Sequence, residues 1–370
     1  MCSLSLISQL NPKIASENLM NGYDDLPNKA FWRSAVADNS MYDVAGLWDP
    51  KFKILPNHAV ATYGSCFAQH IGRALTSRGF NWLSTEQAPA GMGAESKVAY
   101  NYDIFTSRTG NIYTTSLLVQ WLQWAFGISE VPEEIWEKNR RYFDPFRPGI
   151  EPGGFASIEE LRASQQQTIK SFRDSILGAN LLFFTLGLTE RWKNVLHDFE
   201  YPLCPGVVAG TFDVNVHKYE NMEYSGVREA LSAALKIMRK HNPELRVILT
   251  VSPVPLTATK SGKHVLIATM QSKSILRAVA GQISDRRQYV DYFPSYEIIN
   301  SPVFRGSFFE PNQRNVTKHG VRFVMDTFFH ELEEKFGEPQ TTTDAQQIQQ
   351  IAEELVCEDE LLAAFATGVK

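Results

Sequence analysis

The apolar positions of this chain fall into short continuous runs that alternate with longer amphipathic stretches. Continuous runs at 59–63, 181–185 and 247–251 are typical of strands buried on both faces of a parallel sheet. Other segments place apolar residues three or four positions apart, which predicts helices at 67–78, 158–176, 227–240, 269–283 and 320–336. Strands that alternate with helices in this way indicate a parallel sheet covered by helices.

Two further short segments, at 80–83 and 289–291, predict additional strands. Together with the three buried runs they make a sheet of five strands. We therefore expect an α/β protein, a three-layer αβα sandwich with a five-stranded, mainly parallel, flavodoxin-like sheet.

The domain organisation is predicted from changes of composition along the chain. Residues 1–57 form an irregular arm, in which Phe31, Trp32, Trp48 and Phe52 are expected to pin the segment across the core. The main domain then spans 58–338. It includes an insertion at about 88–155 that is longer than an ordinary connection and is expected to cover the sheet edge and shape the substrate cleft. Residues 339–370 are expected to form a polar linker and an acidic, weakly amphipathic helix that docks loosely or binds a partner.

Composition narrows the class of protein. The 370 residues carry a formal net charge of −5, and no cluster of Lys and Arg tracks a phosphate backbone, so we expect no nucleic-acid partner. The four cysteines are scattered without the spacing of a metal site or a disulfide framework, which fits a reducing compartment. No run approaches the roughly 20 apolar residues of a membrane span, and the N-terminus lacks a secretory signal. We expect a soluble cytoplasmic protein without a bound metal or cofactor.

The stretch 61–68 carries the strongest candidate chemistry. A strand-like run ends at Gly64, Ser65 and Cys66 follow, and a helical pattern begins at Phe67. This order places a hydroxyl and a thiol at the carboxyl edge of the sheet, where ligands bind in open α/β folds and backbone N–H groups face a developing anion. Since adjacent side chains point in different directions, only one of them faces the cleft. Ser65 is the expected nucleophile, and Cys66 is the alternative unless it packs between sheet and helix.

The five residues Gly64-Ser65-Cys66-Phe67-Ala68 spell the signature of the GSCFA family, which the chain resembles over most of its length. Further stretches that look like this family lie at 31–33, 185–190, 249–255, 272–274 and 292–297. The GSCFA family is similar to the SGNH/GDSL esterases and O-acyltransferases, in which the serine of the first block is the nucleophile. The resemblance therefore implies a nucleophilic Ser65 on an SGNH-type sandwich.

A second turn, Gly187-Leu188-Thr189-Glu190, follows a buried strand just as the first turn does, so both open on the same edge of the sheet. In SGNH enzymes the corresponding block carries an Asn of the oxyanion hole, and Thr189 stands in that position here. A threonine hydroxyl can donate one hydrogen bond. Glu190 is a candidate for orienting a base or a substrate hydroxyl. The alternative for Thr189 is a structural cap on the following segment.

The general base is not supplied by the usual SGNH residues. The late Asp and His are replaced by Asn-Gln-Arg-Asn at 312–315, and amides cannot accept the serine proton near neutral pH. His264, in the loop after a buried strand, and His319, at the entrance of the last helix, are the two candidates, with solvated or capping histidines as the alternative. Lys273 and Arg277 share one helical face and are either cleft-mouth groups for an anionic substrate or surface charges.

These residues predict an SGNH-like serine esterase or O-acyltransferase that acts on an acyl (acetyl) ester of a carbohydrate through an acyl-enzyme on Ser65. His264 or His319 would act as general base and then general acid. The Ser65 backbone N–H and the Thr189 hydroxyl would hold the oxyanion.

The preference for a small-molecule or glycan substrate depends on the SGNH likeness and on aromatic residues expected near the cleft, namely Trp82, Trp192 and Tyr113. Because the late Asp and His are absent, the alternative is a catalytically inactive module. Such a module would keep the SGNH scaffold and bind a glycan or a nucleotide sugar without hydrolysing it.

Overall fold

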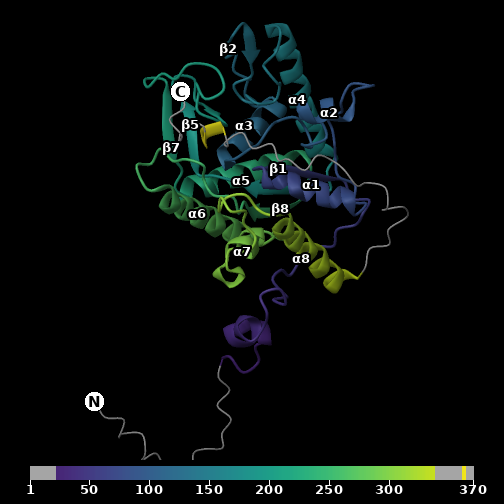
Figure 1. The fold of residues 1–370 in the computed structure, drawn as a ribbon. Helices are drawn as coiled ribbons and strands as arrows, with labels where there is room; N and C mark the ends of the chain where they lie inside the picture. Colours follow the sequence, from purple (N-terminus) through teal and green to yellow (C-terminus); the bar gives the residue numbers. More distant parts are fainter. Residues whose placement is uncertain (1–21, 338–360, 364–370) are drawn as a thin grey trace, which may run out of the picture. The chain divides into compact units, whose positions relative to one another are not determined.

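The computed structural model describes residues 22–337 and 361–363, and the chain divides into two compact units, 1–46 and 47–370. The first unit contains a 3-10 helix, η1 (Asn28–Ala30), and a π-helix, η2 (Arg33–Ala37). Phe31 and Trp32 are exposed. The second unit contains the remaining elements (Figure 1). The linker and helix expected at 339–370 lie outside the described residues, apart from a single 3-10 turn at 361–363.

A parallel sheet forms the centre of the second unit. Its strands are β1 (Val60–Gly64), β4 (Leu181–Leu186), β8 (Arg246–Val251) and β9 (Val290–Tyr292), in the spatial order β1-β4-β8-β9. All three neighbouring pairs run parallel, with Thr62 opposite Phe183 and Phe183 opposite Ile248. The predicted α/β fold with a mainly parallel sheet is confirmed, but the sheet has four strands in the described residues, not five.

The expected fifth strand, at 80–83, is reduced to a single bridge. Trp82 pairs in parallel with Val60, and the Leu83 N–H donates to the Val60 carbonyl at 2.8 Å. The Trp82 indole N–H donates to the Thr62 hydroxyl at 3.0 Å, so this ring is a structural neighbour of β1. The bridge occupies the place of the second strand in the flavodoxin order 2-1-3-4-5. The predicted topology is therefore kept, although the ladder is too short to count as a strand.

Helices cover both faces of the sheet. One layer contains α1 (Phe67–Ser77), α7 (Ser295–Asn300) and α8 (Lys318–Phe336); the other contains α3 (Thr115–Ala125), α4 (Ile158–Gly178), α5 (Tyr224–His241) and α6 (Val265–Arg286). Figure 1 shows α1 and α8 side by side. The smaller elements are α2 (Ala94–Ala99), the hairpin of β2 (Trp136–Lys138) and β3 (Arg141–Phe143), and η3 (Pro302–Phe304).

The continuous apolar runs follow from this layering. Phe183 of β4 faces Phe328 of α8, with ring centroids 5.5 Å apart. On the opposite face, Tyr63 of β1 meets Phe172 of α4 at 4.9 Å. Because both faces of each central strand are buried, the alternation of polar and apolar residues typical of a one-sided sheet is lost.

The segment just before β1 lies against the last elements of the chain. Trp48 is buried and stacks on Phe328 of α8, with ring centroids 5.0 Å apart. The Lys51 ammonium donates to the carbonyls of Ser284 and Val290, the latter at 2.8 Å. Lys51 thereby links this segment to the last turns of α6 and to β9.

A second, antiparallel sheet follows β4, and the sequence patterns did not predict it. β5 (Glu190–Asn194) lies between β6 (Phe199–Tyr201) and β7 (His217–Asn221). β5 begins four residues after β4 ends, so this small sheet stands beside the carboxyl edge of the parallel sheet (Figure 1). It supplies much of the wall of the pocket described below.

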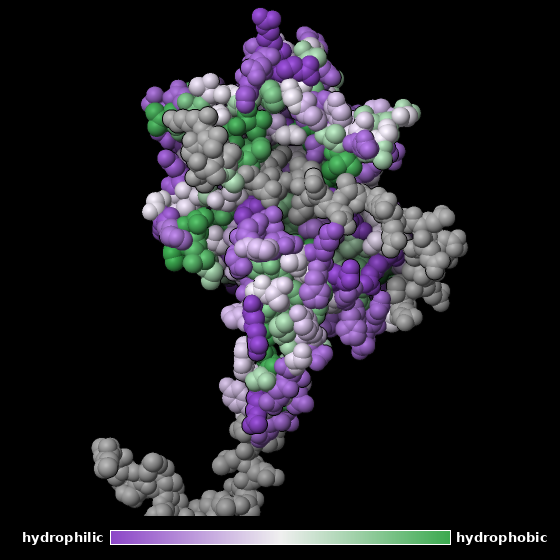
Figure 2. Space-filling view, viewed as in Figure 1, coloured by the Kyte–Doolittle hydropathy of each residue, from purple (hydrophilic) through white to green (hydrophobic). Residues whose placement is uncertain are grey.

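Several exposed apolar areas are visible on the face of the molecule in Figure 2. Leu266, Ile267 and Met270 lie on the first turns of α6, and Leu196 and Val214 lie on loops of the small sheet. None of these five residues lines the pocket.

Candidate active site

The turn from β1 to α1 can be built only with glycine at its first position. Gly64 has φ = +123°, and a Cβ added there would lie 2.2 Å from the Thr185 carbonyl oxygen. Next along the chain, the Ser65 N–H donates to that same oxygen at 3.0 Å. This contact ties the turn to the end of β4 and fixes the position of Ser65.

Ser65 is enclosed in the structure. The residue is 3% exposed, and its hydroxyl oxygen is buried without a hydrogen-bond partner in the described part of the chain. Its Cβ lies against Gly187, because a Cβ built on Gly187 would be only 3.1 Å away. Ser65 also precedes α1, and the Ala68 N–H donates to its carbonyl at 2.8 Å. The serine therefore lies between the start of a helix and the turn after β4.

Cys66 occupies the N-cap position of α1 and is 3% exposed. Its φ of −51° and ψ of −27° are already helical. The second thiol of the described region, Cys204, lines the pocket, and burial raises its pKa to about 11. Cys204 is therefore protonated at neutral pH and is a poor nucleophile.

The turn after β4 is held from two directions. The N–H groups of Gly187 and Leu188 both donate to the Tyr113 carbonyl at 3.0 Å. From the opposite direction, the Lys273 ammonium donates to the Gly187 carbonyl at 2.8 Å. Lys273 is 1% exposed, so it is not the group at the cleft mouth that its helical spacing suggested. Its partner in that pattern, Arg277, forms an ion pair with Glu297.

Thr189 is fully buried, and its hydrogen bonds are structural. Its hydroxyl donates to the Asn221 side-chain oxygen at 2.7 Å, and its N–H donates to the Ser272 hydroxyl at 3.1 Å. The Thr189 carbonyl accepts the N–H of Met222. In this conformation both expected oxyanion donors, the Ser65 N–H and the Thr189 hydroxyl, are already bonded to protein atoms.

The two candidate bases lie in exposed positions. His264 is the N-cap of α6, and its Nδ1 accepts the Leu266 N–H at 3.2 Å. His319 lies in the first turn of α8, with its ring 5.6 Å from that of Phe308. His70, in the second turn of α1, has its pKa lowered to about 3 by burial and by Arg73, and it is therefore neutral at physiological pH. None of these imidazoles bonds to Ser65 in the described region.

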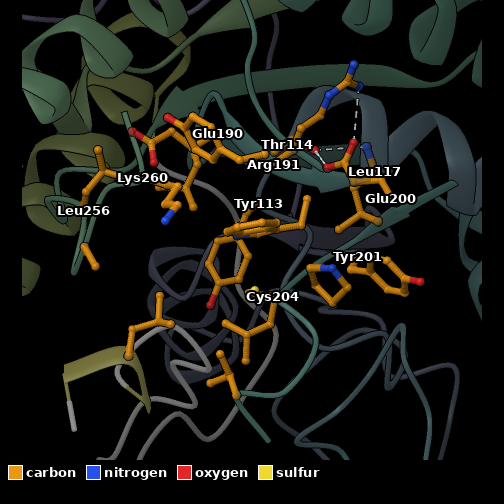
Figure 3. Close-up of a pocket in the computed structure, with 18 of the residues that line it drawn as sticks. Tyr113, Thr114, Leu117, Glu190, Arg191, Glu200, Tyr201, Cys204, Leu256 and Lys260 are labelled. Carbon is orange, nitrogen blue, oxygen red and sulfur yellow. Dashed lines mark hydrogen bonds and ion pairs between the residues drawn. The ribbon is translucent and has the colours of Figure 1, made fainter. Parts of the chain in front are cut away.

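A pocket of about 450 Å³ opens beside the second turn (Figure 3). Tyr113 stands in its middle, with Glu190 and Lys260 on one side and Thr114 and Glu200 on the other. The Glu190 carboxylate accepts the Thr259 hydroxyl at 2.6 Å. Of the predicted site residues, the structure places Glu190 in the lining of the pocket. Ser65, Thr189 and the two histidines are not among its lining residues.

Glu200 is a buried carboxyl group that the sequence analysis missed. Its carboxylate accepts the hydroxyls of Thr114 and Ser116 and forms an ion pair with Arg191 at 3.4 Å. Burial raises the pKa of Glu200, and these donors oppose the shift. In the sequence, Glu200 stands between two aromatic residues, a pattern that fits a buried strand. Because a charge buried in a strand has to be paired, this pattern could have indicated a partnered carboxylate.

The other groups that reasoning from sequence missed are Lys260 and Tyr219. Lys260 lies in the loop after β8, and burial together with Glu190 raises the pKa of Tyr219 to about 12. Trp192 and Tyr113 line the pocket as expected, whereas Trp82 does not. The pocket residues Tyr113, Trp192, Tyr219 and Lys260 lie far apart in the sequence, so no local pattern links them. They meet only in the folded chain.

Two further findings concern the described residues only. No group of three His, Cys, Asp or Glu side chains there is placed to hold a metal ion. Within the same ranges, no helix has the length and apolar character needed to cross a membrane.

The fold and site define an αβα protein of flavodoxin-like strand order with a serine-bearing turn after its first strand. The family profile for GSCFA matches residues 59–328, and the chain belongs to the GSCFA family. No curated protein shows significant similarity in sequence to the chain.

Two solved structures show weak likeness to this chain. A carbohydrate esterase family 3 protein from Talaromyces cellulolyticus is 11% identical with a TM-score of 0.34, and an acetyl esterase mutant with an acetate ion is 10% identical with a TM-score of 0.31. Each match covers 75% of this chain and 97% of the other.

Proposed function

We propose that this GSCFA protein is an SGNH-like serine esterase or O-acyltransferase with Ser65 as its nucleophile. One observation carries the proposal: the Ser65 hydroxyl is buried at the carboxyl end of β1 and makes no hydrogen bond in the described region. A buried polar group without a partner costs about 1–3 kcal/mol. Such a group in a native structure is a candidate for a catalytic role. The nearby pocket at the sheet edge supports the same conclusion.

In the proposed reaction, the Ser65 oxygen attacks the acyl carbon of an ester while its proton passes to an imidazole. The bond between the acyl carbon and the alcohol oxygen breaks, the alcohol leaves with that proton, and an acyl-enzyme remains. Water, or an acceptor hydroxyl in a transferase, then attacks the acyl carbon and releases Ser65. The N-terminus of α1 lies next to Ser65, and the positive end of the helix dipole would stabilise the oxyanion.

We propose His264 as the base, with His319 as the alternative. Both side chains are exposed and neither bonds to Ser65, so the reaction requires a movement that opens the serine and brings an imidazole to it. The loop at 252–264 is suited to this role, since it carries both His264 and the pocket residues Thr259 and Lys260.

We propose an acylated carbohydrate as the substrate. Tyr113, Trp192 and Tyr219 line the pocket with aromatic rings, and such rings bind the apolar face of a sugar. The Glu190 carboxylate lies at the same place and would accept a sugar hydroxyl.

The test is the Ser65→Ala substitution. We expect wild type to hydrolyse p-nitrophenyl acetate and acetylated oligosaccharides and to be labelled by a fluorophosphonate, and both properties to fall at least about 1,000-fold in the variant. Ser77→Ala is the matched control, because Ser77 is an exposed serine at the other end of the same helix. Equal turnover by wild type and Ser65→Ala would disprove the serine mechanism.

A second function is favoured by the positions of the histidines. With no imidazole bonded to Ser65, the scaffold could bind a glycan or a nucleotide sugar without hydrolysing it. In that case neither wild type nor Ser65→Ala would react with the fluorophosphonate, and both would bind the sugar with the same Kd. Labelling at Cys66 by a thiol reagent, with loss of turnover in Cys66→Ala, would instead indicate cysteine chemistry.

A further inference from the structure

The walls of the pocket are mostly apolar. Leu117, Leu188, Leu203, Val207 and Leu256 come from separate segments of the chain and meet around one space. A wall of this composition favours an aliphatic ligand, because each buried methylene leaves water.

The carboxylates in the pocket already have protein partners. Glu190 accepts the Thr259 hydroxyl, and Glu200 accepts the Thr114 hydroxyl and pairs with Arg191. Their demand for hydrogen bonds is therefore met in part by the protein itself, and the leucine-lined region remains free for apolar contact.

The volume exceeds what an acetyl group needs. If a methylene takes up about the space of one water molecule in the liquid, roughly 30 Å³, the pocket of about 450 Å³ would hold more than ten carbons. An acetyl group has only two. The volume is therefore large enough for an acyl chain longer than acetyl beside the sugar ring proposed above.

An aliphatic side chain of the protein itself already contacts this space. Leu362, in the 3-10 turn at 361–363, is one of the residues that line the pocket. A leucine is chemically close to a short stretch of an acyl chain. Its position shows that branched aliphatic carbon is accommodated next to the leucine-rich wall.

The pocket is connected to the candidate nucleophile through two shared residues. Tyr113 and Leu188 line the pocket. The Tyr113 carbonyl accepts the N–H groups of both Gly187 and Leu188, and Ser65 packs against Gly187. A chain that starts at an acyl carbon bound to Ser65 would enter the pocket beside the Tyr113 ring.

We infer that the leucine-lined part of this pocket binds a medium-length aliphatic acyl chain, so that an ester with an acyl group of roughly six to twelve carbons is preferred and an acetyl ester is cleaved less efficiently. The inference rests on the proposed function, because it names the acyl half of the substrate of Ser65.

Binding can be measured apart from catalysis. In full-length Ser65→Ala, the affinity for the methyl ketones butan-2-one, hexan-2-one and decan-2-one is measured from the fluorescence of Trp192, with Trp192→Phe to identify its signal. We expect about fourfold tighter binding per added methylene, the ratio that corresponds to the ~0.8 kcal/mol of a buried CH₂. An affinity that does not increase with chain length would overturn the inference.

Two substitutions locate the chain in the pocket. Ala258→Trp adds bulk at an exposed residue of the lining and should weaken decan-2-one binding at least tenfold, while Ala278→Trp adds the same bulk at an exposed residue of α6 outside the lining. Leu362→Ala should weaken decan-2-one binding several-fold, because it removes part of the apolar wall. Equal affinities in wild type, Ala258→Trp and Ala278→Trp would place the ligand elsewhere and contradict the inference.

A series of p-nitrophenyl esters separates this inference from the proposed function. If kcat/KM rises from acetate to octanoate and is lost in Ser65→Ala, both stand. Turnover that is best with acetate and falls with chain length would retain the serine esterase and refute the acyl pocket. If no ester is cleaved but ketone affinity still rises with length, the pocket assignment holds and the catalytic proposal fails.

Discussion

At the scale of single residues, the turn at Gly64 shows how far a short motif determines geometry. The apolar run that stops at a glycine predicts from the sequence alone that Ser65 lies at the sheet edge. The reason for the glycine is visible only in the structure, where its Cα approaches the Thr185 backbone too closely for any side chain. The environment of the serine hydroxyl depends on Gly187 and Tyr113, which are far away in sequence. No local sequence pattern could have predicted that environment.

Gly64→Ala should strongly destabilise the fold. The new methyl group would collide with the Thr185 backbone at 2.2 Å, and alanine would also be strained at φ = +123°, so we expect a loss of more than about 3 kcal/mol. Urea unfolding measures the change. Gly79→Ala is the matched control, because Gly79 has φ = +74° with nothing within 4 Å of an added Cβ. Its cost should be about 1 kcal/mol, and equal losses in the two variants would show that the collision is relieved.

Lys273→Met tests the buried ammonium beside the second turn. The variant removes the donor to the Gly187 carbonyl, and leaving a buried carbonyl unpaired costs about 1–3 kcal/mol. We expect that loss in unfolding free energy and a fall in esterase turnover, since Ser65 packs on Gly187. Lys263→Met, at an exposed lysine, should change neither quantity by a measurable amount. Unchanged stability in Lys273→Met would mean that the turn does not depend on this bond.

At the scale of elements, the long helices and buried strands were predictable because their periodicity is strong. The predicted helix at 158–176 appears as α4 (Ile158–Gly178), and the run at 181–185 appears as β4 (Leu181–Leu186). The small sheet was missed because β5 reads Glu-Arg-Trp-Lys-Asn, with three charged residues in five. Its charges are held by partners on neighbouring segments, such as the Arg191–Glu220 ion pair, and such long-range pairing overrides local propensity.

The carboxyl group of Glu200 should make stability depend on pH. Its pKa is raised in the folded state by burial, so the folded protein holds this proton more tightly than the unfolded chain. Stability therefore falls as pH rises above 4.5, the ordinary pKa of a glutamate, until the folded pKa is passed, with a slope of at most about 1.4 kcal/mol per pH unit. In Glu200→Gln this component should vanish when urea unfolding is followed from pH 4 to about 7.

Glu220→Gln is the control for that measurement. Glu220 binds the same Arg191, but its side chain is 43% exposed. Its removal should leave the pH slope of wild type in place. If the slope persists in Glu200→Gln, another group titrates in this range.

At the scale of the whole molecule, the parallel sheet between two helix layers was predictable from the order of its parts. The number of strands was not, because the segment at 80–83 has strand-like residues but forms only one bridge to β1. The pocket could not be predicted from the sequence for a similar reason, since its walls come from 113–117, 188–207, 219, 256–260 and Leu362 and converge only in the folded chain. Motifs locate the chemistry at one turn, whereas the shape of the cleft depends on long-range packing.

Deletions from the N-terminus should separate the two units. Removing residues 1–46 should leave the Tm of the second unit almost unchanged, because that unit is compact by itself. Removing residues 1–57 also deletes Trp48 and Phe52, which are both buried, and should cost at least about 3 kcal/mol. Calorimetry on the two shortened proteins distinguishes these outcomes, and an equal loss of Tm in both would contradict the boundary.

The bonds of Lys51 to Ser284 and Val290 have a consequence for how this protein is made. The ribosome synthesises Trp48 and Lys51 early, but their partners on α6, β9 and α8 emerge more than 200 residues later. Until then the ring of Trp48 has no native neighbour to cover it, and closure over so long a loop is slow. Nascent chains halted before α8 should therefore be bound by chaperones through this early segment, because the side chains that bury it are present only in the complete chain.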